Sequence, residues 1–220
     1  MRFKDFDLFL FDLDGLLIDS EAMHWRAYKA MCAQFGCTMT WDLSSYLVTA
    51  GSSADALQQR LREEFPQIFE GREWSEIYAL KQQTLFNHIR INPPKPMPGA
   101  KVFVQQLKRL NKPMVVVTHS PREVVDGIQG LFPEIDRWIT REDYVRPKPA
   151  PDGYLCACRL YAVDPSCAIG FEDTVKGIRA LEAAGCHGIL VNVQAQKGEN
   201  VFHSFTDMEL MINPNPTSRP

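Results

Sequence analysis

Four acidic side chains, one lysine and one threonine stand near the points where short apolar runs of this 220-residue sequence end. They are Asp12, Asp14, Thr118, Lys148, Glu172 and Asp173. The apolar runs are typical of buried β-strands, and Lys148 lies in the segment that follows one of them. Because open parallel sheets bind ligands beyond the carboxyl ends of their strands, we expect these six side chains to converge on one rim.

The chemistry of such a rim follows from its residue types. Four neighbouring carboxylates need a counter-charge, because like charges raise one another's pKa. An oxygen-rich, nitrogen-poor and sulfur-free donor set suits Mg²⁺, which takes hard ligands and keeps waters for substrate phosphate. A carboxylate can then attack a phosphoryl group and form an aspartyl-phosphate, while the second member of the pair Asp12 and Asp14 serves as general acid and then base. Thr118 can donate to a phosphoryl oxygen and Lys148 supplies positive charge, so the set predicts phosphoryl transfer.

The elements that position these residues alternate in type. The nearly continuous apolar run from Phe6 to Asp14 predicts a strand buried on both faces. Further strands are predicted at residues 114–118, 138–140, 167–171 and 187–193. Helices are predicted at residues 102–110, 122–131, 151–161 and 175–184. Strands and helices that alternate in this way predict an α/β fold, with a Rossmann-like parallel sheet and right-handed crossovers.

A long stretch without a convincing strand separates the first predicted strand from the others. Helices are predicted there from residue 20 to 35, from Ser52 and Ser53 to about Phe65, and from residue 74 to 91. A proline-dense connector, PPKPMPG, follows, and it can be neither helix nor central strand. The sequence therefore predicts an α/β core of residues 1–16 and 93–220, interrupted after its first strand by a small helical domain of residues 17–92.

Composition excludes several classes of protein. The sequence has 24 Lys+Arg against 27 Asp+Glu, a net charge of −3, which argues against a nucleic-acid partner. No run approaches the roughly 18 apolar residues of a membrane span, and the first residues do not resemble a targeting peptide. Six thinly spread cysteines fit reduced thiols better than a disulfide framework. We expect a cytoplasmic protein with no membrane partner, and a monomer, because no heptad or exposed apolar stripe is evident.

Four segments together resemble the motifs of the haloacid dehalogenase-like hydrolase superfamily. They are FDLDGLLIDSE, VVTHS, RPKPAPDGY and GFEDTVKGI, and each occurs in the family's order at a predicted strand end. The branch they resemble contains β-phosphoglucomutases and sugar-phosphate or nucleotide phosphatases. The resemblance covers nearly the whole chain, and the helical insert resembles the family's mobile cap.

The resemblance implies a role for each matching residue. Asp12 would be the nucleophile, and Asp14 the general acid and base, which also offers its backbone carbonyl to magnesium. Thr118 and Lys148 would hold the phosphoryl group. The implied Mg²⁺ ligands are Asp12, Asp14, Glu172 and Asp173.

The same resemblance separates possible reactions. Asp14 favours phosphate esters, because the dehalogenase members lack this acid/base aspartate and phosphonatase members carry a small residue there. Mutases of the branch hold a distal phosphate with a cap arginine shortly after a glycine, and the matching place after Gly51 is Ala54. We therefore expect hydrolysis of a small phosphorylated metabolite, a sugar phosphate or a nucleotide. A phosphomutase and a non-catalytic phosphate-binding protein are the alternatives.

The sequence allows more than one role for each of two histidines, His119 and His24. Thr118, His119 and Ser120 superficially suggest a Ser/His pair, but neighbours on a strand point to opposite faces. We expect His119 to offer its backbone N–H to phosphate. His24, in the first predicted helix, is expected to pack or to lie on the helix surface, with a role in closing the insert or contacting substrate as the alternative.

Overall fold

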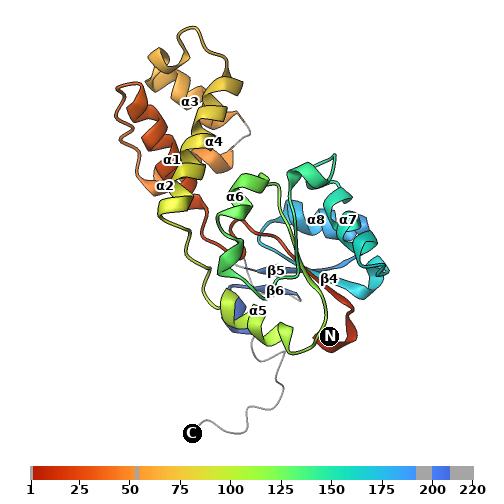
Figure 1. Ribbon diagram of the computed structural model, residues 1–220. Coiled ribbons are helices and arrows are strands. Elements are labelled where there is room, and N and C mark those ends of the chain that lie inside the picture. The colour runs from red at the N-terminus through yellow and green to blue at the C-terminus, as the bar shows by residue number, and fades with distance from the viewer. Residues whose placement is uncertain (1, 53–54, 192–199, 209–220) are drawn as a thin grey trace, which may run out of the picture. The chain divides into compact units, whose positions relative to one another are not determined.

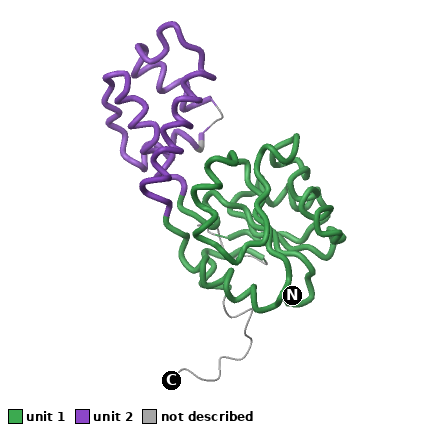
Figure 2. Tube along the Cα trace, in the orientation of Figure 1, with its two compact units in different colours: residues 1–19, 95–220 green, residues 20–94 purple. Residues whose placement is uncertain are grey.

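The computed structural model describes residues 2–52, 55–191 and 200–208. Their contacts divide the chain into two compact units, which we call the core unit, residues 1–19 and 95–220, and the helical unit, residues 20–94 (Figure 2). These boundaries lie slightly later than the expected ones. A backbone pairing accounts for the shift: Asp19 N–H donates to the Lys95 carbonyl and Met97 N–H donates to the Leu17 carbonyl, each at 2.9 Å.

The core unit contains a six-stranded sheet in the order β3-β2-β1-β4-β5-β6, in which every pair of neighbours is parallel (Figure 1). The strands are β1 (Leu8–Phe11), β2 (Met114–Val117), β3 (Arg137–Ile139), β4 (Ala168–Glu172), β5 (His187–Val191) and β6 (Val201–Phe202). The parallel sheet confirms the predicted α/β fold class. Phe11 is in register with Val116 on one side and Phe171 on the other, so β1, β2 and β4 end at the same edge.

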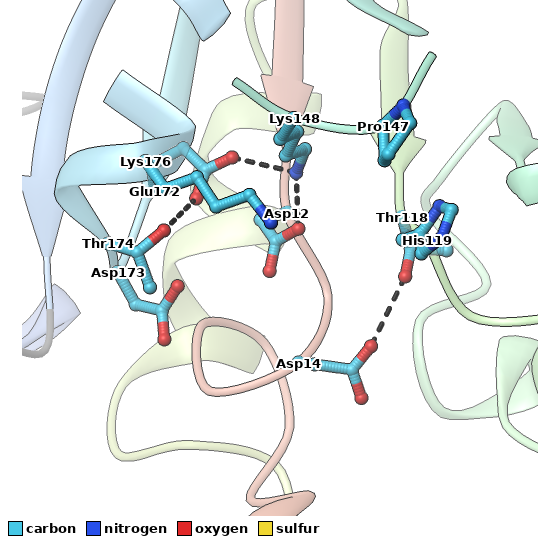
Figure 3. Close-up of a pocket in the computed structure, with 10 residues that line it drawn as sticks. All are labelled: Asp12, Asp14, Thr118, His119, Pro147, Lys148, Glu172, Asp173, Thr174 and Lys176. Atoms are coloured by element: carbon cyan, nitrogen blue, oxygen red, sulfur yellow. Dashed lines mark hydrogen bonds and ion pairs between the residues drawn. The ribbon is translucent and has the colours of Figure 1, made fainter. Parts of the chain in front are cut away.

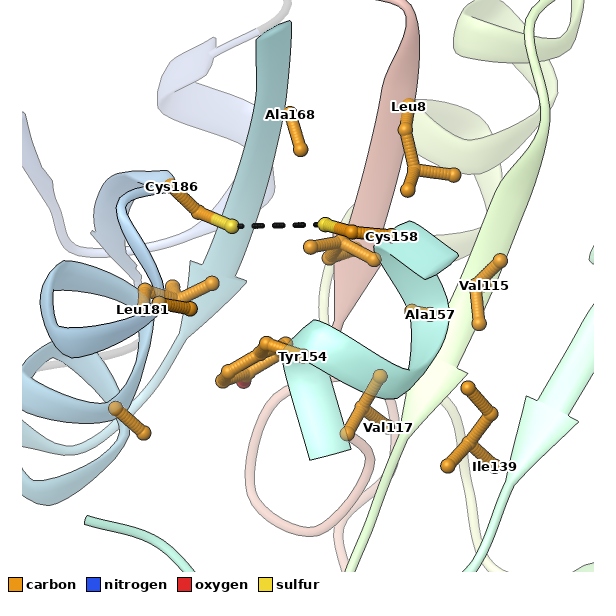
Figure 4. Close-up of a cluster of buried hydrophobic side chains, with 13 residues drawn as sticks. Leu8, Val115, Val117, Ile139, Tyr154, Ala157, Cys158, Ala168, Leu181 and Cys186 are labelled. Atoms are coloured by element: carbon orange, nitrogen blue, oxygen red, sulfur yellow. Dashed lines mark hydrogen bonds between the residues drawn. The ribbon is translucent and has the colours of Figure 1, made fainter. Parts of the chain in front are cut away.

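Helices cover both faces of the sheet. They are α5 (Ala100–Lys108), α6 (Arg122–Asp126), α7 (Asp152–Leu160) and α8 (Val175–Ala184). Along β1, Leu8 and Leu10 belong to a buried cluster that also contains side chains of α7 and α8 (Figure 4). On the other face, Phe3 packs edge-on against Phe9 and against Phe103 of α5. A strand buried on both faces explains the continuous apolar run.

Most predicted elements of the core unit keep their type with slightly shifted ends, and two differences are larger. The predicted helix 122–131 ends at Asp126 and resumes as a 3-10 turn at Gln129–Leu131, because Gly127, directly after Asp126, has a low helix propensity. Strand β6 was not predicted, since two residues are too few to show an alternating pattern. The last two residues of the predicted strand 187–193 lie outside the described residues.

The helical unit contains α1 (Glu21–Gln34), α2 (Leu43–Ser52), α3 (Ala56–Glu64) and α4 (Trp74–Ile91). Helix α2 was not predicted, because its hydroxyl and β-branched residues have low helix propensity. Arg60 of α3 compensates by donating to the hydroxyls of Ser45, at 3.0 Å, and Thr49, at 2.8 Å. The prediction that Ser52 opens a helix is wrong, because Ser52 ends α2; Ser53 lies outside the described residues.

The helical unit has its own core, and His24 contacts a buried lysine of the same unit. Tyr28, Trp41 and Leu61 are among the buried residues of this cluster. Lys81 of α4 is only 2% exposed, and its Nζ lies 2.6 Å from His24 Nδ1. His24 therefore packs within this unit. Among the described residues, no helix is both long and apolar enough to cross a membrane.

Candidate active site

A pocket opens at the carboxyl edge of the sheet (Figure 3). It is lined by Asp12, Asp14, Thr118, His119, Pro147, Lys148, Glu172, Asp173, Thr174 and Lys176. The structure thus brings together every residue that the sequence predicted for the site. They come from the ends of β1, β2 and β4 and from the loop before α7, as the strand-end rule predicts.

The turn after β1 places Asp12 and Asp14 in the pocket, and Gly15 makes this turn possible. Gly15 has a φ of +82°, a left-handed conformation that glycine adopts without strain. A Cβ atom at this position would also lie 2.2 Å from Asp173 Oδ2. The absence of a side chain at Gly15 therefore lets the loop after β4 approach the loop after β1.

Lys148 lies between two of the acidic residues, Asp12 and Glu172. Its Nζ donates to Asp12 Oδ1, lies 2.7 Å from Glu172 Oε1 and donates to the Val117 carbonyl at 2.9 Å. Burial of Lys148 disfavours its charged form, but the Asp12 and Glu172 carboxylates outweigh this effect and raise its pKa well above the ordinary value. Lys148 therefore stays cationic beside Asp12.

Three carboxylates form a group that fits a hard cation. Each of Asp12, Glu172 and Asp173 offers an oxygen within 4.8 Å of the others, with no nitrogen or sulfur donor in the group. Burial, together with the other carboxylates, raises the pKa of Asp12 well above its usual value, although Lys148 opposes the shift. Burial and Glu172 raise the pKa of Asp173 to about 7. A bound divalent cation would favour the ionised forms, so the donor set fits Mg²⁺.

The Asp14 side chain lies apart from these carboxylates. Its Oδ2 accepts hydrogen bonds from Ser120 Oγ at 2.7 Å and from Thr118 Oγ1 at 3.2 Å. Figure 3 shows it turned toward the end of β2. A contact of Asp14 with magnesium would therefore use its backbone carbonyl, while the carboxyl group is available for proton transfer in the pocket.

Thr118 and His119 occupy the end of β2. The Thr118 hydroxyl accepts from Ser120 N–H at 3.0 Å, and the Ser120 hydroxyl donates to Asp14, so Ser120 is engaged with the acid. His119 lines the pocket with its Nδ1 3.4 Å from the Tyr144 hydroxyl. Partial burial and the nearby cations Arg141 and Lys176 lower the pKa of His119, which favours its neutral form near pH 7.

Sequence reasoning assigned no role to four polar residues at or near this site. Thr174 and Lys176 line the pocket, and both follow β4, so the strand-end rule could have found them. Ser120 follows β2 in the same way. Tyr154 has no such signal, because it lies inside α7 and only the tertiary fold brings its hydroxyl to Glu172.

Gly177 provides a test of how tightly this site is packed. A Cβ at Gly177, in α8, would lie 1.9 Å from Glu172 Cδ. Alanine in a helix normally stabilises by about 1 kcal/mol relative to glycine. Here we expect Gly177→Ala to destabilise the fold by about 1–3 kcal/mol through overpacking, and to lower kcat by displacing Glu172.

Thermal denaturation and a phosphate-release assay measure these effects. Gly130→Ala is the matched control, because a Cβ there would meet nothing within 4 Å, and we expect no loss of activity. A higher Tm for Gly177→Ala than for the unchanged protein would contradict the packing argument.

Comparison of the sequence with known proteins identifies a family and several relatives. The model of the haloacid dehalogenase-like hydrolase family matches residues 6–185. Validoxylamine A 7'-phosphate phosphatase of Streptomyces hygroscopicus subsp. limoneus is 31% identical over 194 residues, which cover 85% of this chain and 87% of that protein. Hexitol phosphatase A of Escherichia coli is 29% identical over 218 residues, covering 94% of this chain and 95% of that one.

A solved structure shows the same fold. The crystal structure of CbbY from Rhodobacter sphaeroides, in complex with phosphate, superposes with a TM-score of 0.73 at 22% identity and covers 93% of this chain and 96% of that chain. At this identity the similarity concerns the arrangement of helices and strands.

Proposed function

The chain belongs to the haloacid dehalogenase-like hydrolase family and is a phosphoric monoester hydrolase, and from this premise we propose that it hydrolyses a small phosphorylated metabolite with Mg²⁺, through an aspartyl-phosphate on Asp12. One observation carries the proposal. The Asp12 carboxylate contacts the Lys148 ammonium and lies within 4.8 Å of oxygens of Glu172 and Asp173, inside a pocket that also contains Asp14. This is the arrangement that a carboxylate nucleophile for a phosphoryl group needs.

In the proposed first step, a carboxylate oxygen of Asp12 attacks phosphorus while the ester oxygen leaves. Asp14 gives its proton to that oxygen, and an alcohol departs. In the second step Asp14, now a carboxylate, removes a proton from water as the water oxygen attacks the same phosphorus. The bond between phosphorus and Asp12 breaks, inorganic phosphate is released, and both aspartates return to their starting states.

The other pocket residues bind and orient the phosphoryl group. Lys148 supplies positive charge to the developing transition state, Thr118 donates its hydroxyl, and His119 offers its backbone N–H. Magnesium held by Asp12, Glu172, Asp173 and the Asp14 carbonyl would supply further positive charge beside the phosphoryl oxygens. The helical unit serves as a cap in this proposal.

The names of the two relatives support a substrate that is a phosphate ester of a polyhydroxylated carbon compound, such as a hexitol phosphate or a sugar phosphate.

A mutase would need a residue that holds a second phosphate group. The expected position of that residue, Ala54, lies outside the described residues. We place the reaction in the cytoplasm, because thinly spread cysteines that form no disulfide among the described residues fit a reducing compartment. The monomeric state stays a prediction.

The proposal is tested by measuring phosphate release with Mg²⁺ over hexitol phosphates, sugar phosphates, nucleoside monophosphates and an aryl phosphate. We expect inorganic phosphate to appear in proportion to substrate lost, with no bisphosphate activator. Isomerised sugar phosphate without phosphate release would identify a mutase. If no compound reacts, the proposal is wrong and the alternative of a non-catalytic phosphate-binding protein is favoured.

Chelation gives a second test, with a readout that does not need turnover. We expect EDTA to abolish activity and Mg²⁺ to restore it. In thermal denaturation, Mg²⁺ at about 100 times its Kd should stabilise the fold by about 2.7 kcal/mol, because a cation bound only by the folded state shifts unfolding by mass action. Asp173→Asn, which removes one carboxylate of the group, should reduce this shift. Full activity in EDTA would contradict the metal requirement.

A further inference from the structure

One buried tyrosine contacts two charged residues of the site, although it does not line the pocket. Tyr154 of α7 is 1% exposed and lies in the hydrophobic cluster between α7, α8 and the sheet (Figure 4). Its hydroxyl donates to Glu172 Oε1. The Lys148 Nζ lies 5.0 Å from the centre of its ring, on the face of the ring that attracts cations.

The fold places Tyr154 there for two reasons. Side chains alternate along a strand, so Glu172 at the end of β4 points to the same face as Ala168, which α7 and α8 cover. The residue before Tyr154 is Gly153, where a Cβ would lie 2.7 Å from Val117 Cγ1. Glycine therefore lets the first turn of α7 pack closely on β2, and this brings the Tyr154 hydroxyl within reach of Glu172.

The charges at this point compete for Lys148. Its Nζ contacts Asp12 on one side and Glu172 Oε1, at 2.7 Å, on the other. Glu172 is 1% exposed, so its carboxylate needs hydrogen-bond donors from within the protein. The Tyr154 hydroxyl is such a donor, and it holds Oε1 in place. Without it, we expect Glu172 to draw Lys148 away from Asp12.

We propose that Tyr154 is a positioning residue. Its hydroxyl fixes the Glu172 carboxylate and its ring supports Lys148, so that the Lys148 ammonium stays in contact with the Asp12 carboxylate. This inference rests on the proposed function, because it assigns Tyr154 the placement of the cation that acts in the phosphoryl-transfer step. Because Tyr154 does not line the pocket, it acts through Lys148.

Tyr154→Phe tests the hydroxyl and keeps the ring. A hydrogen bond to a charged group is a strong one, so we expect kcat to fall about tenfold. KM should stay within about twofold, because the loss concerns an interaction made mainly in the transition state. Circular dichroism and a cooperative melt establish that the variant is folded. Tyr161→Phe, at the other end of α7, is the matched control and should leave kcat unchanged.

A double-mutant cycle separates positioning from a general packing defect. Once Lys148→Met has removed the ammonium, adding Tyr154→Phe should lower kcat/KM by less than about twofold, because there is nothing left to position. If the two losses instead multiply, or if Tyr154→Phe alone leaves kcat unchanged, the inference is overturned. Lys148→Gln replaces Lys148→Met if the latter does not fold. Failure of the proposed function is distinguishable, since the unchanged protein would then release no phosphate from any compound.

Discussion

Asp12→Asn is expected to lower kcat by at least about 10⁴-fold while the protein stays folded, since removal of a nucleophile disables a set of residues that act as a unit. A carboxamide has the shape of the carboxylate but cannot attack phosphorus. We expect Tm to change little, because Glu172 still pairs with Lys148 at 2.7 Å. Phosphate release and thermal denaturation measure the two effects.

The covalent step can be observed directly in the same experiment. Acid quenching during turnover of a radiolabelled substrate should trap phosphate on the unchanged protein and none on Asp12→Asn. Asp7→Asn is the matched control: Asp7 precedes the opposite end of β1, is exposed and pairs with Lys112 at 2.7 Å. It should keep full activity. Residual activity well above about 0.01%, the level that a 10⁴-fold loss leaves, would exclude Asp12 as the nucleophile.

Asp14→Asn is expected to lower kcat by about 10²–10⁴-fold, the usual contribution of a general acid or base. The amide can still accept from Ser120 and Thr118, which lie 2.7 Å and 3.2 Å from the carboxylate, so the pocket should keep its shape. The variant can neither protonate the departing alcohol nor activate water. We therefore expect the loss to depend on the leaving group.

An aryl phosphate reveals this dependence. Its leaving group needs little protonation, so Asp14→Asn should still form the aspartyl-phosphate but hydrolyse it slowly. Rapid-mixing measurements should show a burst of one aryl alcohol per protein molecule and then slow turnover. Alkyl phosphates should show no burst. Unchanged rates with both substrates would remove the acid and base role of Asp14.

Several helices were predictable because their signals are local. The helices at residues 74–91 and 175–184 have the bounds that the sequence predicts, since apolar residues repeat at helical spacing from end to end. Helix α2 was missed because its own residues disfavour a helix, and Arg60, from another helix, holds it through hydrogen bonds to Ser45 and Thr49. Elements that depend on a distant partner cannot be found from local pattern alone.

The amino-acid sequence was enough to predict that six polar side chains lie at one edge of a parallel sheet, because each of them follows a predicted strand along the chain. The arrangement of the charged side chains within the pocket became visible only in the tertiary structure. That structure put Lys148 against Asp12 and Glu172, turned Asp14 toward Ser120, and brought Tyr154 to Glu172. These contacts join residues far apart in the chain, and their geometry depends on how the helices pack on the sheet, which periodicity does not encode.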